Sequence, residues 1–209
     1  MKIIDFDELP STQTYLVENL RSGLLKSPIC IVAKKQSAGI GSRGNDWKQV
    51  ENALTFSFSY EISSLPQDLP TQSASIFFGF IFKETLASMG FDVWLKWPND
   101  VYFEDRKIAG IIVNVWKNNL VCGIGLNISA SNFASLKTTI DKKAFLEIFF
   151  EKIKNTLEWK DIFSKYELEF YKNFSFSFHH QNRKIDLQEA KLCSDGGIEI
   201  NGEKIYSFR

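Results

Sequence analysis

Residues 95–111 read LKWPNDVYFEDRKIAGI, and the signals within this stretch set the fold around it. Pro98 ends a strand-like apolar run, because proline has no N–H to donate within a sheet. Asn99-Asp100 then turns the chain before a next strand that begins at Lys107. Lys96 lies inside the apolar run, where its ammonium either reaches solvent at a sheet edge or is held to meet an anion. Lys107, taken alone, is a surface charge.

Strand and helix patterns continue in both directions from this block. Residues 53–60 alternate apolar and polar side chains, the period-two pattern typical of a half-buried strand. Lys117-Asn118-Asn119 is a hairpin turn between two apolar runs, and Ser11 or Thr12 is a helix N-cap. The patterns predict strands at 2–9, 29–35, 53–60, 92–98, 108–116 and 120–128, helices at 12–22 and 71–89, and a helical segment 141–173 broken near Lys160-Asp161.

The end of the sequence changes to short strands. Asp195-Gly196-Gly197 and Asn201-Gly202 are turns, so residues 175–209 are expected to form a small β unit that needs the rest of the chain for its stability. For residues 1–174 we expect an α/β (α+β) domain in which helices flank a mixed sheet.

Composition limits the partners. Lys plus Arg and Asp plus Glu are both 25, a formal net charge of zero, whereas nucleic-acid-binding proteins usually carry a basic excess. The start MKIIDFDELP is not a secretory signal, and no apolar run approaches the roughly 20 residues of a membrane span. Three scattered cysteines form no zinc or disulfide framework. These features predict a cytoplasmic protein without a nucleic-acid partner, a membrane or a dedicated metal site.

A glycine-rich segment, residues 34–47 (KKQSAGIGSRGNDW), contains the pattern G-x-G-x-x-G. A dinucleotide-binding fold needs a helix directly after it, but the alternating strand 53–60 follows instead. A kinase loop needs a lysine on the next strand and the motifs H-R-D and D-F-G, which the sequence lacks. The segment is therefore an ordinary turn or a loop that closes over a ligand, with Arg43 able to grip an anion and Trp47 offering a ring face.

A second glycine pattern lies in the strand-like run CGIGLNIS at residues 122–129. Glycines weaken a strand unless a ligand or another backbone must approach it closely. Asn127, at the end of the run, either hydrogen-bonds a base edge or caps the next loop.

Five blocks occur in a fixed order: Ser11-Thr12-Gln13, residues 36–47, residues 96–100, residues 106–110 and residues 123–127. Together they resemble the catalytic domain of biotin–protein ligases over about residues 3–128, and the K-W-P-N-D and R-K-x-A-G blocks are specific in combination. The resemblance implies the fold shared with class II aminoacyl-tRNA synthetases and lipoate ligases, with a C-terminal SH3-like β unit. It also implies a ligase that joins biotin and ATP into biotinyl-5′-AMP and transfers biotin to one lysine of a carrier protein, the biotin carrier subunit of acetyl-CoA carboxylase.

The resemblance also assigns roles to individual residues. Lys96 would lie between the biotin carboxylate and the α-phosphate of ATP and neutralise both, with Arg43 as a second catalytic group. Mg²⁺ would arrive with ATP and need no protein cage. The implied biotin contacts are Ser11, Thr12, Gln13, Gln36, Ile40, Gly41, Ser42 and Lys96, and the implied ATP and adenylate contacts are Arg43, Gly44, Trp47, Asn99, Lys107 and Asn127.

The glycine loop departs from the family at two positions. Many relatives have arginines where Ile40 and Ser42 stand, so Arg43 is the arginine that remains in this loop. Either Arg43 or backbone amides carry the phosphate contact, and we expect the adenylate to be held less firmly. Some members of the family carry an N-terminal DNA-binding helix-turn-helix domain. The matching blocks here begin close to Met1, so we expect no such domain and no nucleic-acid partner.

Two alternative functions stay open. A lipoate or octanoate ligase shares the fold but typically shows an R-R-x-S-G-G-G stretch, which is absent here. A non-catalytic biotin-binding relative would keep the cavity without the chemistry, and the presence of both Lys96 and Gln36 argues against it. The oligomeric state stays open as well, because monomers and sheet-edge dimers share these motifs.

Overall fold

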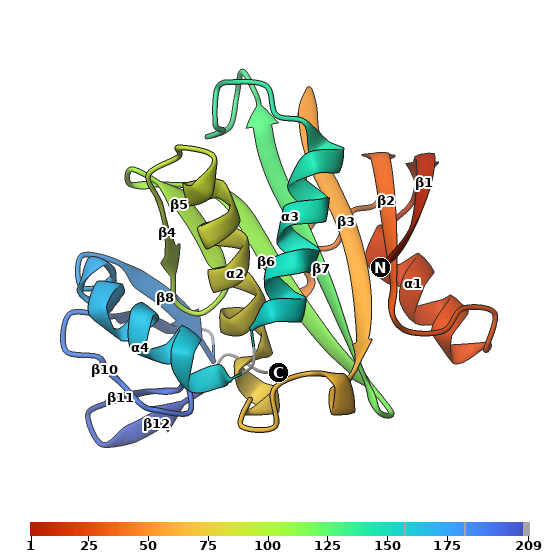
Figure 1. Cartoon of the computed structure of the whole chain (residues 1–209). Helices are drawn as coiled ribbons and strands as arrows, with labels where there is room; N and C mark the ends of the chain where they lie inside the picture. The colour runs from red at the N-terminus through yellow and green to blue at the C-terminus, as the bar shows by residue number, and fades with distance from the viewer. Residues whose placement is uncertain (157, 182, 207–209) are drawn as a thin grey trace.

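The fold is built on a seven-stranded mixed sheet with the strand order β1-β2-β3-β7-β6-β5-β4 (Figure 1). The structure, a computed structural model, describes residues 1–156, 158–181 and 183–206, and of Arg43 only the backbone. β1 and β2 are parallel, and the other neighbouring pairs are antiparallel. The strands are β1 (Lys2–Leu9), β2 (Ile29–Gln36), β3 (Asn52–Glu61), β4 (Val93–Lys96), β5 (Asp100–Phe103), β6 (Arg106–Trp116) and β7 (Asn119–Ser129).

Helices cover the two faces of this sheet unequally. On one face, alternate residues of β3 and β7 pack with α2 and α3 into the main aromatic core, where the Phe58 ring centroid lies 5.0 Å from that of Phe78 and 5.5 Å from that of Phe149. On the other face, α1 packs against the sheet through a small apolar cluster around Leu16 and Ile31. That second face therefore stays open beside α1. The helices are α1 (Thr12–Arg21), α2 (Ala74–Ser88), α3 (Lys142–Asn155) and α4 (Trp159–Glu169), and the 3₁₀ turns are η1 (Ser42–Gly44), η2 (Ile62–Ser64), η3 (Thr71–Ser73) and η4 (Phe170–Asn173).

The sequence pattern was wrong about the segment that follows Pro98. Asp100–Phe103 forms the strand β5, which pairs with both β4 and β6, whereas we expected a turn leading to a strand at Lys107. Four residues are too few to display a periodicity of their own, so β5 is defined by pairing on both sides rather than by its pattern.

The break in the long helical segment was also predicted in the wrong place. α3 ends at Asn155 and α4 begins at Trp159, so Lys160-Asp161 lies within the first turn of α4. The Asp68 carboxylate accepts hydrogen bonds from the backbone N–H groups of Trp159 (2.7 Å) and Lys160 (3.1 Å). A cap supplied by a loop about ninety residues away in sequence leaves no local signal, and it is this contact that sets the start of α4.

The chain after residue 174 forms two small antiparallel sheets that share the main core. Phe178, Leu187 and Ile198 belong to the same buried cluster as the aromatic residues of β3 and α2. The predicted domain boundary at residue 174 and the SH3-like topology stay predictions. The strands are β8 (Ser177–His180), β9 (Arg183–Asp186), β10 (Lys191–Leu192), β11 (Ile198–Ile200) and β12 (Glu203–Ile205).

Trp97 joins these C-terminal strands to the end of β4. It is 1% exposed, its backbone N–H donates to Asn173 Oδ1 (2.8 Å), and its indole N–H donates to the Gly196 carbonyl (3.0 Å). Its ring also meets Phe178 edge-on, with centroids 4.8 Å apart. The tryptophan of the K-W-P-N-D block thus fixes the position of the C-terminal strands beside the sheet.

Replacing Trp97 with phenylalanine should loosen that attachment. The substitution keeps a ring but leaves the Gly196 carbonyl without its donor, which costs about 1–3 kcal/mol for a buried group. We expect backbone amides of β10–β12 to exchange their hydrogens faster in Trp97→Phe, as measured by mass spectrometry. Trp94→Phe is the control, because it removes a similar bond to the Glu104 carbonyl (2.8 Å) inside the main sheet. Equal exchange in Trp97→Phe and wild type would contradict the anchoring role.

Candidate functional site

The floor of the candidate site is the face of the sheet that α2 and α3 leave open. Ile111 and Ile124 point into the main core, so their neighbours along each strand point to the opposite face. In the β6–β7 register Gly110 pairs with Gly125, and Ile112 pairs with Gly123. Three of these four positions lack a side chain, which leaves a shallow depression in the floor.

Trp47 lies directly on two of these glycines. A Cβ atom at Gly125 would be 2.7 Å from Trp47 Cζ2 and 2.8 Å from its Nε1, and a Cβ at Gly110 would be 3.2 Å from its Cζ3. Non-bonded heavy atoms do not come as close as the 2.7 and 2.8 Å that a Cβ at position 125 would require. Trp47 can therefore reach the floor only because position 125 is glycine. The buried indole N–H has no hydrogen-bond partner among the described residues.

The glycine loop holds Trp47 in this place through its own hydrogen bonds. Gly41 N–H donates to the Asn45 carbonyl (2.7 Å) and Trp47 N–H donates to the Gly39 carbonyl (2.8 Å), around the 3₁₀ turn η1. No helix follows, and the chain continues into β3. Residues 39–47 therefore form a short closed loop, called the flap below, and not a dinucleotide-binding motif.

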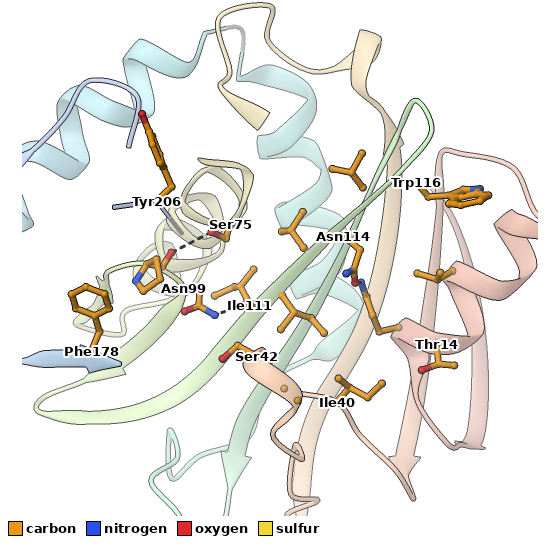
Figure 2. Close-up of a pocket in the computed structure, with 18 of the residues that line it drawn as sticks. Thr14, Ile40, Ser42, Ser75, Asn99, Ile111, Asn114, Trp116, Phe178 and Tyr206 are labelled. Atoms are coloured by element: carbon orange, nitrogen blue, oxygen red, sulfur yellow. Dashed lines mark hydrogen bonds between the residues drawn. The ribbon is translucent and has the colours of Figure 1, made fainter. Parts of the chain in front are cut away.

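Two adjoining cavities lie beneath and beside this flap. A small one of about 30 Å³ is bounded by α1, β3, the floor and Trp47, and its size corresponds to about one water molecule. A wide cleft of about 520 Å³ runs along β6, with Thr14 and Trp116 on one side and Phe178 and Tyr206 on the other (Figure 2). Residues of the flap line both spaces, so movement of the flap would enlarge the small cavity.

A chain of hydrogen bonds in the small cavity fixes which groups face a ligand. Thr12 donates to Gln36 Oε1 from its backbone N–H (2.8 Å) and from its hydroxyl (3.0 Å). Its hydroxyl oxygen also lies 2.9 Å from Ser57 Oγ. Because the single Thr12 hydroxyl proton is donated to Gln36, Ser57 is the donor in this second bond. Gln36 is left with its Nε2 group as donor, and Ser57 is left with oxygen lone pairs as acceptor. Ser57 was missed by the sequence analysis, where its alternation in β3 indicated a solvent-facing position, although it is 0% exposed.

Gln13 supplies a second acceptor to the same cavity. Its Nε2 group donates to Asn114 Oδ1 (2.8 Å) and to the Val121 carbonyl (3.1 Å), which uses both of its protons. Its Oε1 atom is buried without a hydrogen-bond partner in the described part of the chain and lies over Gly123, where a Cβ would be 2.6 Å away. A buried acceptor without a donor is destabilising by about 1–3 kcal/mol unless a ligand completes it.

Lys107 provides a cation at the other end of the small cavity. Its Nζ atom is 2.7 Å from Asp100 Oδ1 and 6.0 Å from the centroid of the Trp47 ring, and its side chain is 40% exposed. A Cβ at Gly110 would lie 3.3 Å from the same Nζ. The ammonium therefore lies above the glycine floor, next to the flap and accessible to an anion.

Lys96 occupies a different environment. It pairs with Asp100 across β4 and β5, is only 8% exposed, and places Nζ 5.6 Å from the centroid of the Tyr102 ring and 5.9 Å from that of Phe176. Burial and the neighbouring Asp100 carboxylate raise the pKa of Tyr102 to about 12, so this phenol stays neutral. Lys96 lines neither cavity, and Asp100 lies between it and Gly110 in the register of β4, β5 and β6.

The remaining predicted site residues divide between the two spaces. Ser11 caps α1 by accepting from Thr14 N–H, and it also lines the small cavity. Asn127 follows Gly125 on the same face but lines neither cavity; its Oδ1 is buried without a partner among the described atoms. The Arg43 side chain lies outside the described residues. Ile40, Gly41, Ser42 and Asn99 line both spaces, and Gly44 lines the wide cleft.

Within residues 1–156, 158–181 and 183–206, no group of three or more His, Cys, Asp or Glu side chains is placed to hold a metal ion. Across the same ranges, none of the helices has the length and apolar character needed to cross a bilayer.

Known proteins resemble this chain in sequence and in fold. Residues 6–129 match the model of the biotin/lipoate A/B protein ligase family. The bifunctional ligase/repressor BirA of Escherichia coli is 35% identical over 128 residues, which cover 58% of this chain and 39% of that protein. The biotin–[acetyl-CoA-carboxylase] ligase of Mycobacterium tuberculosis is 29% identical over 126 residues, which cover 57% of this chain and 46% of that protein. The chain thus spans less than half the length of these two relatives.

Solved structures match over nearly the whole chain. The biotin acetyl coenzyme A carboxylase synthetase of Helicobacter pylori, with bound biotinylated ATP, superposes with a TM-score of 0.96 at 48% identity, covering 98% of this chain and 99% of that one. The biotin protein ligase of Aquifex aeolicus, in complex with biotin and ATP, gives a TM-score of 0.73 at 25% identity, covering 94% and 90%. These matches confirm the predicted mixed α/β fold and the family resemblance.

A methyl group at Gly125 should displace the flap. We expect Gly125→Ala to increase hydrogen exchange at the Gly41 and Trp47 amides, because the alanine Cβ would occupy the space of the indole. In a Trp47→Ala background, where no indole competes for that space, Gly125→Ala should add little, since coupled positions are not additive. Additive effects of the two substitutions would show that Trp47 does not depend on the glycine floor.

Proposed function

We propose, since the chain belongs to the biotin/lipoate A/B protein ligase family, that it is an ATP-dependent biotin–protein ligase. It would activate biotin as biotinyl-5′-AMP, release pyrophosphate, and transfer the biotinyl group to a lysine of a biotin carrier protein. The carrier subunit of acetyl-CoA carboxylase is the proposed acceptor. A cytoplasmic location stays a prediction.

The observation that carries this proposal is the arrangement of donors and acceptors in the small cavity. Gln36 Nε2 is a donor, because Gln36 Oε1 already accepts from Thr12. Ser57 Oγ is an acceptor, because its proton is donated to Thr12. Gln13 Oε1 is an acceptor as well, because both protons of the Gln13 amide are donated elsewhere. A cyclic urea presents the complement, one carbonyl oxygen flanked by two N–H groups. A buried site of this kind rejects ligands that leave its polar atoms unpaired.

The first chemical step would take place over Gly110. A biotin carboxylate oxygen attacks the α-phosphorus of ATP, an O–P bond forms, and the bond to pyrophosphate breaks. Two anions must approach each other, so a cation between them lowers the barrier. Lys107 lines the small cavity, and its side chain is 40% exposed. The geometry supports Lys107 rather than Lys96 for this role, with Asp100 orienting the ammonium.

The second step would use the wide cleft. The neutral amine of the carrier lysine attacks the biotinyl carbonyl carbon, an amide bond forms, and AMP leaves with the former acyl oxygen. The cleft adjoins the small cavity at the flap and follows β6 from Ile111 to Trp116 (Figure 2). A lysine side chain entering from the cleft would meet the acyl group at that junction. Mg²⁺ would enter bound to the ATP phosphates and screen the leaving pyrophosphate.

Pyrophosphate exchange into ATP tests the activity and separates the two lysines. Wild type should catalyse exchange that depends on biotin and is not supported by lipoate. Lys107→Ala should reduce the exchange rate by about 10²–10³-fold, the usual effect of removing one charge-stabilising donor. Lys96→Ala should reduce it much less, with an effect mainly on stability. A loss in Lys96→Ala that equals or exceeds the loss in Lys107→Ala would contradict the assignment to Lys107.

Retention of the adenylate tests the role of the flap. Ile40 and Ser42 line both cavities, and Ile40 is 45% exposed. Adding cations there should slow dissociation of biotinyl-5′-AMP by at least about tenfold, because one charge-assisted phosphate contact contributes about 1.5–3 kcal/mol and about 1.4 kcal/mol corresponds to tenfold. The measurement is the dissociation rate of labelled adenylate from Ile40→Arg/Ser42→Arg. The charge-neutral pair Ile40→Gln/Ser42→Gln is the control, and equal rates in all three proteins would contradict the expectation.

A lipoate ligase is the alternative from the same family. A dithiolane ring offers neither an N–H nor a carbonyl, so it would leave Gln13 Oε1 and Gln36 Nε2 without partners. The small cavity therefore favours biotin. Exchange supported by lipoate in place of biotin would select the alternative.

A further inference from the structure

We propose that Asn114 is a positioning residue, which fixes the Gln13 amide so that its oxygen faces the biotin ring as an acceptor. This inference rests on the proposed biotin ligase function. Asn114 belongs to none of the sequence blocks that carried the family resemblance. It is exposed and lines the wide cleft, beyond Ile111 along β6 (Figure 2).

The direction of the Gln13–Asn114 hydrogen bond follows from its surroundings. The Val121 carbonyl can only accept, so the atom of Gln13 at 3.1 Å from it must be the amide nitrogen. The same nitrogen lies 2.8 Å from Asn114, which must therefore present Oδ1. The Val121 carbonyl thus fixes the orientation of both side-chain amides, so the usual ambiguity between the two flipped orientations of Asn and Gln does not arise here.

The consequence for the cavity is the location of Gln13 Oε1. With both protons of Nε2 committed, the oxygen is directed to the space over Gly123, where Ser57 Oγ is also an acceptor. Removal of the Asn114 acceptor leaves one Nε2 proton without a partner and lets the amide rotate toward the cleft. The hydrogen bond from the ring N–H of biotin to Gln13 Oε1 would then be weakened, whereas binding of the ATP phosphates would not change.

Exposure makes Asn114 suitable for substitution. Gln13 is 5% exposed, but Asn114 is exposed, so its variants should fold. Asn114→Asp keeps an oxygen acceptor at the same place, and Asn114→Ala removes it. Asn118→Ala is a matched control, since Asn118 is an exposed asparagine in the β6–β7 turn.

The test is the dissociation constant of biotin for the full chain by titration calorimetry, together with kcat and the KM for ATP. We expect Asn114→Ala to weaken biotin binding about fivefold, as for the loss of one ordinary hydrogen bond. Asn114→Asp should bind within about twofold of wild type, and Asn118→Ala should be unchanged. The KM for ATP and kcat at saturating biotin should stay near wild type.

A double-mutant cycle with Gln13→Met establishes that Asn114 acts through Gln13. Methionine has similar size but no acceptor, so Asn114→Ala should have no further effect on biotin binding in that background. An undiminished effect there, or unchanged binding in Asn114→Ala alone, would overturn the inference while leaving the ligase function intact. Failure of the wild-type chain to bind biotin would overturn the proposed function itself, and the inference with it.

Discussion

The absence of two side chains, at Gly110 and Gly125, is the constraint on which the site depends. These residues pair across β6 and β7 on the open face of the sheet. Because neither has a Cβ, the Trp47 ring and the Lys107 ammonium can both come into contact with the backbone there. Glycine ordinarily weakens a strand interior. Here the two flanking strands and the aromatic core on the far face hold β6 and β7 in place, and the floor beneath Trp47 and Lys107 stays free of side chains at these two positions.

The polar side of the site is fixed by hydrogen bonds that each have one possible direction. Thr12 N–H can only donate, which sets Gln36, and the Val121 carbonyl can only accept, which sets Gln13. The cavity therefore presents a defined pattern of one donor and two acceptors before any ligand arrives. Preorganisation of this kind gives selectivity without a large contact area, since a mismatched ligand would leave buried polar atoms unpaired.

Much of this could be predicted from the sequence, and the failures have local causes. The alternation in residues 53–60, the hairpin at 117–119 and the ordered blocks gave the sheet and the family. β5 was missed because four residues show no period, and the start of α4 was misplaced because its cap, Asp68, comes from a distant loop.

The sequence named residues for the site but not their geometry. Ser11, Thr12, Gln13 and Gln36, which the resemblance assigns to biotin, line one cavity, and their role as biotin contacts stays a prediction. Which lysine reaches that cavity depends on the β4–β5–β6 register, since Lys96 lies two strands from Gly110 and packs against aromatic rings. Ser57 and Asn114 belong to no motif, and only the pairing of β3, β7 and β6 places them beside α1.

The most direct test of this account is a crystal structure of the chain with biotin bound. We expect the ureido ring over Gly123, with its carbonyl accepting from Gln36 Nε2 and one ring N–H within hydrogen-bonding distance of Gln13 Oε1. We also expect Trp47 to have moved off Gly125 to admit the ligand. A ligand that occupies only the wide cleft, with Trp47 still on the glycine floor, would contradict it.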